Sequence, residues 1–165
     1  YQHHYIGFNY RMTDIQAAIG LVQLEKIERF NKRRREIAQR YSEELSDLEN
    51  LILPVEEEWA RHAWHLYAIR TRGVSRDELV ARLRDMGIDA RPTYPMPIQK
   101  QVAMSELSNP ERNFLAELFK GFNPAKIETP VAERVTKELF YIPIYHCMTD
   151  EEVETVIGAV KTALS

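Results

Sequence analysis

GFNYRMTDIQAAIGL, residues 7–21, joins a polar loop to the start of a helix. Thr13 is followed three residues later by Gln16, the spacing of a capping box, in which the two residues hydrogen-bond each other's backbone N–H groups. Apolar side chains then recur at helical spacing, at Ile15, Ala18, Ile19 and Val22. Because several residues of this helix are small, the sequence predicts one apolar face that packs closely against a neighbour.

Three polar side chains, Asn9, Tyr10 and Arg11, come directly before this helix. A closely packed helix would hold them in fixed positions, and a guanidinium group binds phosphate or carboxylate through paired hydrogen bonds. Two interpretations follow from these residues alone. The loop presents donors to an anionic ligand, or it is ordinary turn chemistry with surface charge.

The same string, continued by Gln23 and Leu24, resembles the signature of the sugar aminotransferases of the DegT/StrS type. These enzymes of fold type I use pyridoxal phosphate to aminate keto sugars carried on nucleotides. Further matching segments cover nearly the whole chain: Arg33-Arg34-Arg35, Ala38, Tyr41, His62-Ala63-Trp64-His65-Leu66-Tyr67 and residues 94–97. The resemblance implies an α/β (α+β) small C-terminal domain, with helices packed on a small sheet.

By this resemblance the chain is the C-terminal portion of the family's sequence. Residues 1–50 would form an interface loop and long helices that join a large domain, and residues 51–165 would form the small domain. Catalysis with pyridoxal phosphate requires a lysine that forms a Schiff base. None of the seven lysines resembles the family's lysine segment, so that lysine is expected upstream and the fragment alone is expected to be inactive.

The resemblance also assigns the binding residues. In the family, the asparagine of the motif reaches the cofactor phosphate of the neighbouring subunit in a homodimer, which assigns this role to Asn9. Arg11 would lie close to the anionic part of cofactor or substrate. Substrate contacts are expected from Tyr10, Arg91, Tyr94 and Gln99, with Arg91 at the nucleotide diphosphate. The family commonly has histidine at the position of Gln99, and glutamine cannot carry a proton, so no acid–base role transfers to it.

Composition narrows the class of protein. The 165 residues, 44% hydrophobic and 28% charged, suffice for a globular domain with a core. The net charge of -3 argues against a nucleic-acid partner. The single cysteine, Cys147, fits a reducing cytosol, and no apolar run approaches the roughly 20 residues of a membrane span. No metal site is expected, since the adjacent His3 and His4 lack partners at ligand spacing.

The pattern of residues predicts a helix–sheet fold. The long charged region after residue 24 predicts two helices that separate near residues 27–31, with Asn31 as a cap. Its run of basic residues at 32–35 is surrounded by glutamates, which predicts an ion-paired helix face. Residues 64–69 predict a strand, a capping box at Ser75 opens a helix that ends at Gly87, and residues 88–94 predict a second strand.

Polar groups on rigid backbone recur at residues 91–99, which contain three prolines. The region after it, residues 104–129, exceeds what the resemblance provides for and reads as an insertion, with a helix predicted over residues 110–120. A strand is expected at residues 139–144. A capping box at Thr149 opens the last helix, whose apolar stripe begins at Val153.

Two alternatives to the sugar aminotransferase remain open from the sequence. A sister enzyme of the same fold could use the cofactor for dehydration of a sugar, which requires replacement of the upstream lysine. A non-catalytic relative that keeps the fold would lose both the lysine and the phosphate ligands. The amino donor implied for the aminotransferase is glutamate or a similar amino acid.

Overall fold

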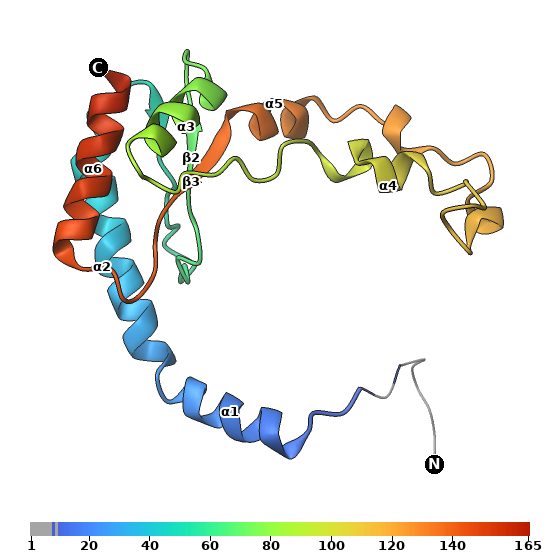
Figure 1. The fold of residues 1–165 in the computed structure, drawn as a ribbon, viewed down its shortest axis with the longest axis horizontal. Helices are drawn as coiled ribbons and strands as arrows, with labels where there is room; N and C mark the ends of the chain where they lie inside the picture. The colour runs from blue at the N-terminus through green and yellow to red at the C-terminus, as the bar shows by residue number, and fades with distance from the viewer. Residues whose placement is uncertain (1–7, 9) are drawn as a thin grey trace.

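The computed structural model describes residue 8 and residues 10–165, and the expected class, helices packed on a small sheet, is confirmed. The helices and strands in chain order are α1 (Asp14–Leu24), α2 (Ile27–Leu45), β1 (Leu51–Ile52), β2 (Tyr67–Thr71), α3 (Arg76–Asp85), α4 (Val102–Ser105), α5 (Pro130–Glu138), β3 (Leu139–Ile142) and α6 (Asp150–Leu164). Short 3₁₀ turns lie at residues 98–100, 116–119 and 124–126. Figure 1 shows α2, α3 and α6 gathered around the sheet, with α1 and residues 92–129 extending away from it.

The sheet is antiparallel, in the order β1-β2-β3. Tyr67 pairs with Ile142 in β3, and Thr71 pairs with Leu51 in β1. Alternate residues of the central strand, Tyr67, Ile69 and Thr71, are buried, as expected for a strand with one face toward a core.

The core lies between this sheet and the helices α2, α3 and α6. Helix α6 contacts both α2 and α3, and α3 also contacts β3. The largest side chains with almost no exposed surface are Tyr41, Tyr67, Phe140, Ile37, Leu45, Ile69, Leu83 and Ile142. Burial of these apolar groups supplies the main driving force for folding.

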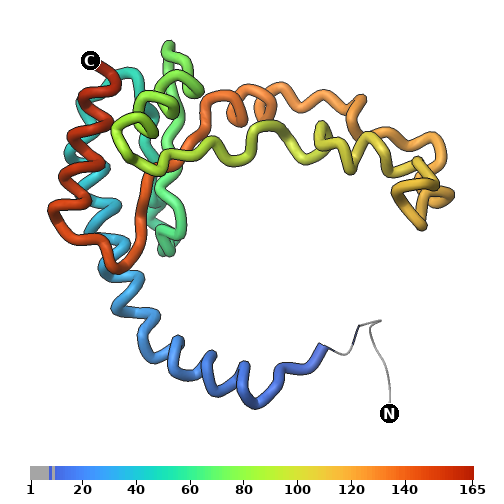
Figure 2. Tube along the Cα trace, viewed as in Figure 1, coloured from blue at the N-terminus to red at the C-terminus, as the bar shows by residue number. Residues whose placement is uncertain are grey.

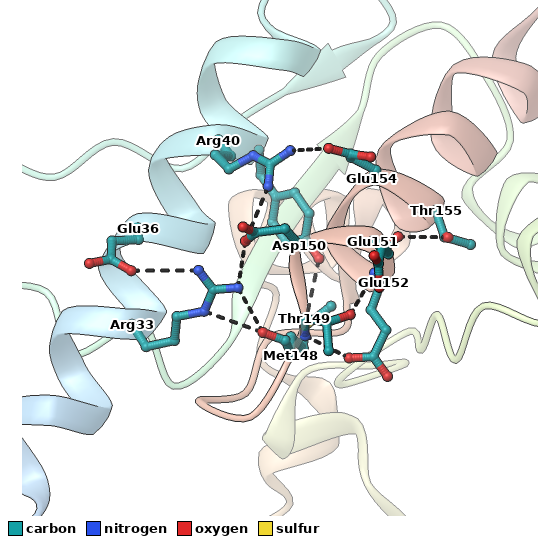
Figure 3. A network of polar contacts seen from close by, with 11 residues as sticks. Arg33, Glu36, Arg40, Met148, Thr149, Asp150, Glu151, Glu152, Glu154 and Thr155 are labelled. Atoms are coloured by element: carbon teal, nitrogen blue, oxygen red, sulfur yellow. Dashed lines mark hydrogen bonds and ion pairs between the residues drawn. The ribbon is translucent and has the colours of Figure 1, made fainter.

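Arginines of α2 hold the start of α6, as Figure 3 shows. Arg33 Nη2 donates to the Met148 carbonyl at 2.7 Å and to Asp150 at 2.8 Å, and Arg40 contacts both Asp150 and Glu154. The hydrogen bond from Arg33 lowers the pKa of Asp150 below its ordinary value. The capping box at Thr149 is confirmed, with both reciprocal bonds formed. The predicted ion pairing of the basic run is present at Arg33, which also lies 3.5 Å from Glu36, whereas Arg34 donates to backbone carbonyls instead.

The next ion pair along α2 predicts how stability changes in acid. Arg35 pairs through two hydrogen bonds with Glu56, which also accepts from the His62 backbone N–H at 2.7 Å. The bond from Arg35 is the main cause that lowers the pKa of Glu56 from 4.5 to about 2. As the pH falls, the Glu56 carboxylate is protonated at a lower pH in the folded state than in the unfolded state. The stability from this pair is therefore complete above pH 4.5 and is lost as the pH falls toward 2.

Replacing Glu56 with glutamine is expected to lower the free energy of unfolding at pH 6 and to have a smaller effect at each step down to pH 2. Urea unfolding of both proteins at a series of pH values measures this difference. Glu57→Gln, at the neighbouring exposed position, is the control and should change little. A difference between wild type and Glu56→Gln that stays constant from pH 6 to pH 2 contradicts the assignment.

Two predicted elements near residue 90 and residue 115 are wrong. Residues 88–94 form no strand, and only a single bridge joins Arg91 to Tyr141. Pro92 and Pro95 lack the N–H groups that a longer ladder would need. The predicted helix over 110–120 is reduced to the 3₁₀ turn at 116–119.

Asparagine side chains explain the loss of that helix. Asn109 Oδ1 accepts from the Glu111 N–H at 3.0 Å, and Asn113 Oδ1 accepts from the Leu115 N–H at 3.0 Å. These bonds give the backbone an alternative to the helical pattern, and they fold the segment into successive turns.

The break between the first two helices lies at Glu25 and Lys26 rather than at Asn31, which lies inside α2. Helix α1 has no buried residue, and Ile15, Ile19 and Val22 are all exposed within the described structure. The expected close packing of its apolar face is therefore absent from this chain by itself. Figures 1 and 2 show why: α1 projects from the end of α2 and touches none of the other core elements.

Candidate functional site

The loop before α1 carries two of the predicted site residues. Tyr10 and Arg11 are both exposed, and the Tyr10 ring stacks on Phe8 with 5.4 Å between centroids. Asn9, the third member, lies outside the described residues. The predicted capping box holds the loop to the helix: Thr13 N–H donates to Gln16 Oε1 at 2.9 Å and Gln16 N–H donates to Thr13 Oγ1 at 3.3 Å. The loop therefore presents Tyr10 and Arg11 outward at the tip of α1.

Arg91 lies at the edge of the sheet, where its backbone N–H and carbonyl both bond Tyr141. Its guanidinium forms a bidentate ion pair with Asp89: Nε donates to Oδ1 at 2.7 Å and Nη2 donates to Oδ2 at 2.6 Å. This bond lowers the pKa of the Asp89 carboxyl and fixes the direction of the arginine. Because a guanidinium has five N–H donors, Arg91 can hold Asp89 and still donate to an anionic ligand.

A cavity of about 510 Å³ opens beside Arg91. Its walls come from the turn after α3, the end of β3 and the first turns of α6. The lining is mainly apolar and also contains tyrosines and ionisable groups: Leu66, Gly87, Ile88, Asp89, Arg91, Tyr141, Ile142, Pro143, Ile144, Tyr145, Met148, Glu152, Thr155 and Val156. This size and this mixture are typical of small-molecule sites.

Tyr94 and Gln99 lie on the projecting segment of residues 92–129, which we call the arm (Figure 2). Tyr94 is 70% exposed. Gln99 is half-buried, and its amide nitrogen donates to Thr129 Oγ1 at the other end of the arm. Lys100 Nζ also crosses the arm, donating to the Ala125 carbonyl at 2.8 Å. Gln99 therefore already has a structural role in joining the two sides of the arm.

The predicted site residues fall into separate groups. Arg91 lies at the base of the arm, with Tyr94 and Gln99 further along it. Tyr10 and Arg11 lie at the tip of α1, which leaves the core on another side (Figure 1). The described chain alone does not bring these two groups into one pocket.

Trp64 is a residue that the sequence reasoning did not select. It has a positive φ of 48° and is only 5% exposed, and its indole N–H has no hydrogen-bond partner among the described residues. Arg34 Nη1 donates to the Trp64 carbonyl at 3.0 Å and so helps to hold this backbone. Such outliers often mark functional segments. The signal was present in the sequence, since Trp64 lies in a segment that carries the family resemblance.

The described part of the chain supports neither a metal site nor a membrane-spanning helix. Residue 8 and residues 10–165 contain no group of three or more histidine, cysteine, aspartate or glutamate residues placed to hold a metal. Among the helices described, none combines the length and the apolar character that a bilayer crossing needs.

The fold, helices packed on a small antiparallel sheet, defines a class: it is that of a partial domain of a fold-type-I aminotransferase. The model of the DegT/DnrJ/EryC1/StrS aminotransferase family matches residues 1–161. The chain therefore belongs to this family, as the resemblance predicted.

Individual proteins show the same relationship. The erythromycin biosynthesis sensory transduction protein EryC1 of Saccharopolyspora erythraea is 32% identical over 98% of the chain and 39% of its own length. The crystal structure of S. venezuelae DesV in complex with a ketimine intermediate is 28% identical, with a TM-score of 0.79 over 100% of this chain and 40% of that one. The chain thus spans about two fifths of the length of these relatives.

Family membership indicates dependence on pyridoxal phosphate. The PLP-form of Spr1654, a sugar aminotransferase homologue from Streptococcus pneumoniae, aligns over 93% of this chain and 36% of its own, with 26% identity and a TM-score of 0.74. The loop before α1 fits one part of this cofactor, because the exposed Arg11 offers the planar N–H donors that suit a phosphate dianion. None of the seven lysines lies on that loop.

Proposed function

We propose that this chain is the C-terminal part of a pyridoxal-phosphate-dependent aminotransferase that aminates a nucleotide-linked keto sugar. The observation that carries the proposal is the exposed loop with Tyr10 and Arg11, fixed by the Thr13 capping box, in a chain of this family. Glutamate or a similar amino acid is the amino donor. Residues 51–165 form the small domain together with α2, whose Ile37, Ala38, Tyr41 and Leu45 lie in its core, and the residues before α2 join it to a large domain.

Pyridoxal phosphate, when bound, supplies the electron sink that allows an amino group to move between donor and sugar. The residues of this chain hold and orient the reactants. Asn9 donates its amide to the cofactor phosphate across the dimer interface, and Arg11 places positive charge beside the same anion. On the substrate side, Tyr10 and Tyr94 border the sugar, Gln99 hydrogen-bonds a hydroxyl, and Arg91 meets the diphosphate.

Helix α1 supports a homodimeric assembly. Its exposed apolar side chains include Ile15, Ile19 and Leu24, which are 75%, 59% and 64% exposed. A large exposed apolar face on a helix is normally covered by other parts of a protein. In the proposed assembly the large domain and the partner subunit cover α1, which brings the loop before it to the neighbouring cofactor.

Transfer of labelled nitrogen tests the proposed reaction. The full-length protein from which this chain comes, given pyridoxal phosphate, ¹⁵N-glutamate and a nucleotide-linked keto sugar, is expected to yield a ¹⁵N-amino sugar that mass spectrometry detects. The isolated chain of residues 1–165 is expected to give none, because its lysines do not include the one that binds the cofactor. Labelled product from the isolated chain contradicts the proposal.

The same assay separates the alternatives. A dehydrated sugar without ¹⁵N identifies the dehydratase of the same fold. Full-length protein that neither binds the cofactor nor changes the sugar identifies a non-catalytic relative, and the name of EryC1, an erythromycin biosynthesis sensory transduction protein, is the reason to test for this class.

A further inference from the structure

A second pocket lies on the far side of the core from α1, where β2 turns into α3 and α5 ends (Figure 1). Its volume is about 490 Å³. We call it the β2–α3 pocket, and its lining residues are Ile52, Arg70, Thr71, Arg72, Gly73, Val74, Ser75, Arg76, Asp77, Arg134, Lys137 and Glu138. It shares no residue with the cavity beside Arg91. That cavity is lined by the last residues of β3, Tyr141 and Ile142, whereas the β2–α3 pocket lies at Glu138, directly before β3.

The lining contains five basic and two acidic side chains, in a protein whose net charge is -3. Such a concentration of positive charge opposes the overall sign of the molecule. Like charges that are held close together repel one another unless anions are present. The pocket therefore has a positive local potential that favours binding of an anion.

Both acidic side chains are already engaged. Glu138 accepts two hydrogen bonds from Arg70, at 3.0 and 2.6 Å, and its other oxygen lies 3.9 Å from Arg134. Asp77 accepts from Arg76 at 2.5 Å. The acids of the pocket thus neutralise part of its charge and leave no further carboxylate for the remaining cations of the lining.

Two of the arginines are fixed by the fold. Arg76 is only 7% exposed and donates to the carbonyls of Thr136 and Leu139, at 3.1 and 2.8 Å. Arg70 lies in β2, with Glu138 holding its guanidinium. These bonds join the end of β2, the start of α3 and the end of α5, so the pocket has a rigid wall that already carries positive charge.

Arg72 and Lys137 differ from the others. Both are exposed, and within residues 10–165 the structure gives their side chains no ion pair and no hydrogen bond. A phosphate group accepts several charge-assisted hydrogen bonds, and guanidinium and ammonium groups are its usual protein partners. Arg72 and Lys137 are placed to supply such bonds without breaking any contact in the described fold.

We propose that the β2–α3 pocket binds a diphosphate group of a small molecule, separately from the substrate site proposed at Arg91. The five basic and two acidic side chains of the lining leave a surplus of three positive charges, which exceeds the roughly two negative charges of a single phosphate and suits the larger charge of a diphosphate. The volume also exceeds what a single phosphate would fill and lies in the range of small-ligand sites. Arg72 and Lys137 bind the diphosphate oxygens, and the fixed guanidinium groups of Arg70 and Arg76 make the potential of the pocket more positive.

Isothermal titration calorimetry of the full-length protein, loaded with pyridoxal phosphate, tests this site. Pyrophosphate and adenosine diphosphate are titrated in separate experiments, which distinguishes the free anion from a nucleotide as the source of the group. The double variant Arg72→Ala/Lys137→Ala is expected to bind about tenfold more weakly or worse, because charge-assisted hydrogen bonds are lost. Both side chains are exposed, and a thermal unfolding curve verifies that the variant folds.

Two further variants make the test specific. Lys120→Ala/Lys126→Ala removes the same charge from exposed positions of the arm and should bind as the wild type does. Arg91→Ala removes the arginine of the proposed substrate site, so any diphosphate binding at that site should weaken, whereas the binding that depends on Arg72 and Lys137 should remain. The proposal is overturned if the wild type binds neither ligand, if both double variants lose binding equally, or if only Arg91→Ala loses it. The last result would leave the proposed function standing.

Discussion

Replacing Tyr41 with alanine is expected to lower the free energy of unfolding by about 3 to 5 kcal/mol, the usual cost of removing a large buried aromatic side chain. Tyr41 is 0% exposed and lies in α2, with its ring 5.1 Å from that of Tyr67 in β2. Its hydroxyl donates to the Pro143 carbonyl at 2.8 Å, after β3. One side chain thus joins α2 to two parts of the sheet region, and urea unfolding measures its loss.

Tyr41→Phe is the matched control, because it keeps the ring and removes only the hydroxyl. We expect a cost of about 1 to 3 kcal/mol, since the buried carbonyl of Pro143 loses its donor. If Tyr41→Ala costs no more than Tyr41→Phe, the ring does not support the core in the way the structure indicates.

The second large effect concerns the cofactor. In the full-length protein, Asn9→Ala is expected to weaken binding of pyridoxal phosphate by about 1 to 3 kcal/mol, the value of a hydrogen bond to a charged acceptor. Adding Arg11→Ala should weaken it further, because the guanidinium places positive charge beside the phosphate. Equilibrium dialysis or cofactor absorbance gives the Kd of each variant.

Gln16→Ala separates this role from a simple role at the helix start. It removes one half of the capping box and should lower stability, with a much smaller loss of cofactor affinity than Asn9→Ala causes, because Asn9 and Arg11 are still present. If Asn9→Ala lowers stability but weakens cofactor binding no more than Gln16→Ala does, the loop is only a helix entrance and the assignment of Asn9 fails.

The parts of the fold that the sequence predicted correctly depend on neighbouring residues. The capping boxes at Thr13 and Thr149 require only a partner three residues away, and both form. The central strand begins at Tyr67 rather than Trp64, because Trp64 adopts a positive φ that a strand cannot contain. The helix expected to end at Gly87 ends at Asp85, and Met86, which follows its last turn, is 44% exposed.

The errors arose where the outcome depends on distant parts of the chain. The segment after Gly87 looked like a strand, but whether it pairs depends on Tyr141, 50 residues later, and on the prolines that limit the ladder to Arg91. The apolar face of α1 was identified correctly as a pattern, but its covering surface is not among the described residues.

The candidate site shows the same division. Sequence resemblance selected Tyr10 and Arg11, and the structure places both on an exposed loop whose geometry the capping box determines. It also selected Gln99, without indicating that Thr129 would occupy its amide. The ion pair between Arg91 and Asp89 joins residues two positions apart, yet opposite charges at that spacing meet only when the backbone turns, which spacing alone does not specify.

Borohydride reduction of the full-length protein in the presence of pyridoxal phosphate tests the central claim most directly. Reduction is followed by digestion and mass spectrometry to locate any phosphopyridoxyl lysine. We predict a single modified lysine outside residues 1–165, as expected for an aminotransferase to which this chain contributes phosphate and substrate contacts. Modification of one of the seven lysines of this chain, or cofactor that binds but is never trapped, would contradict the account.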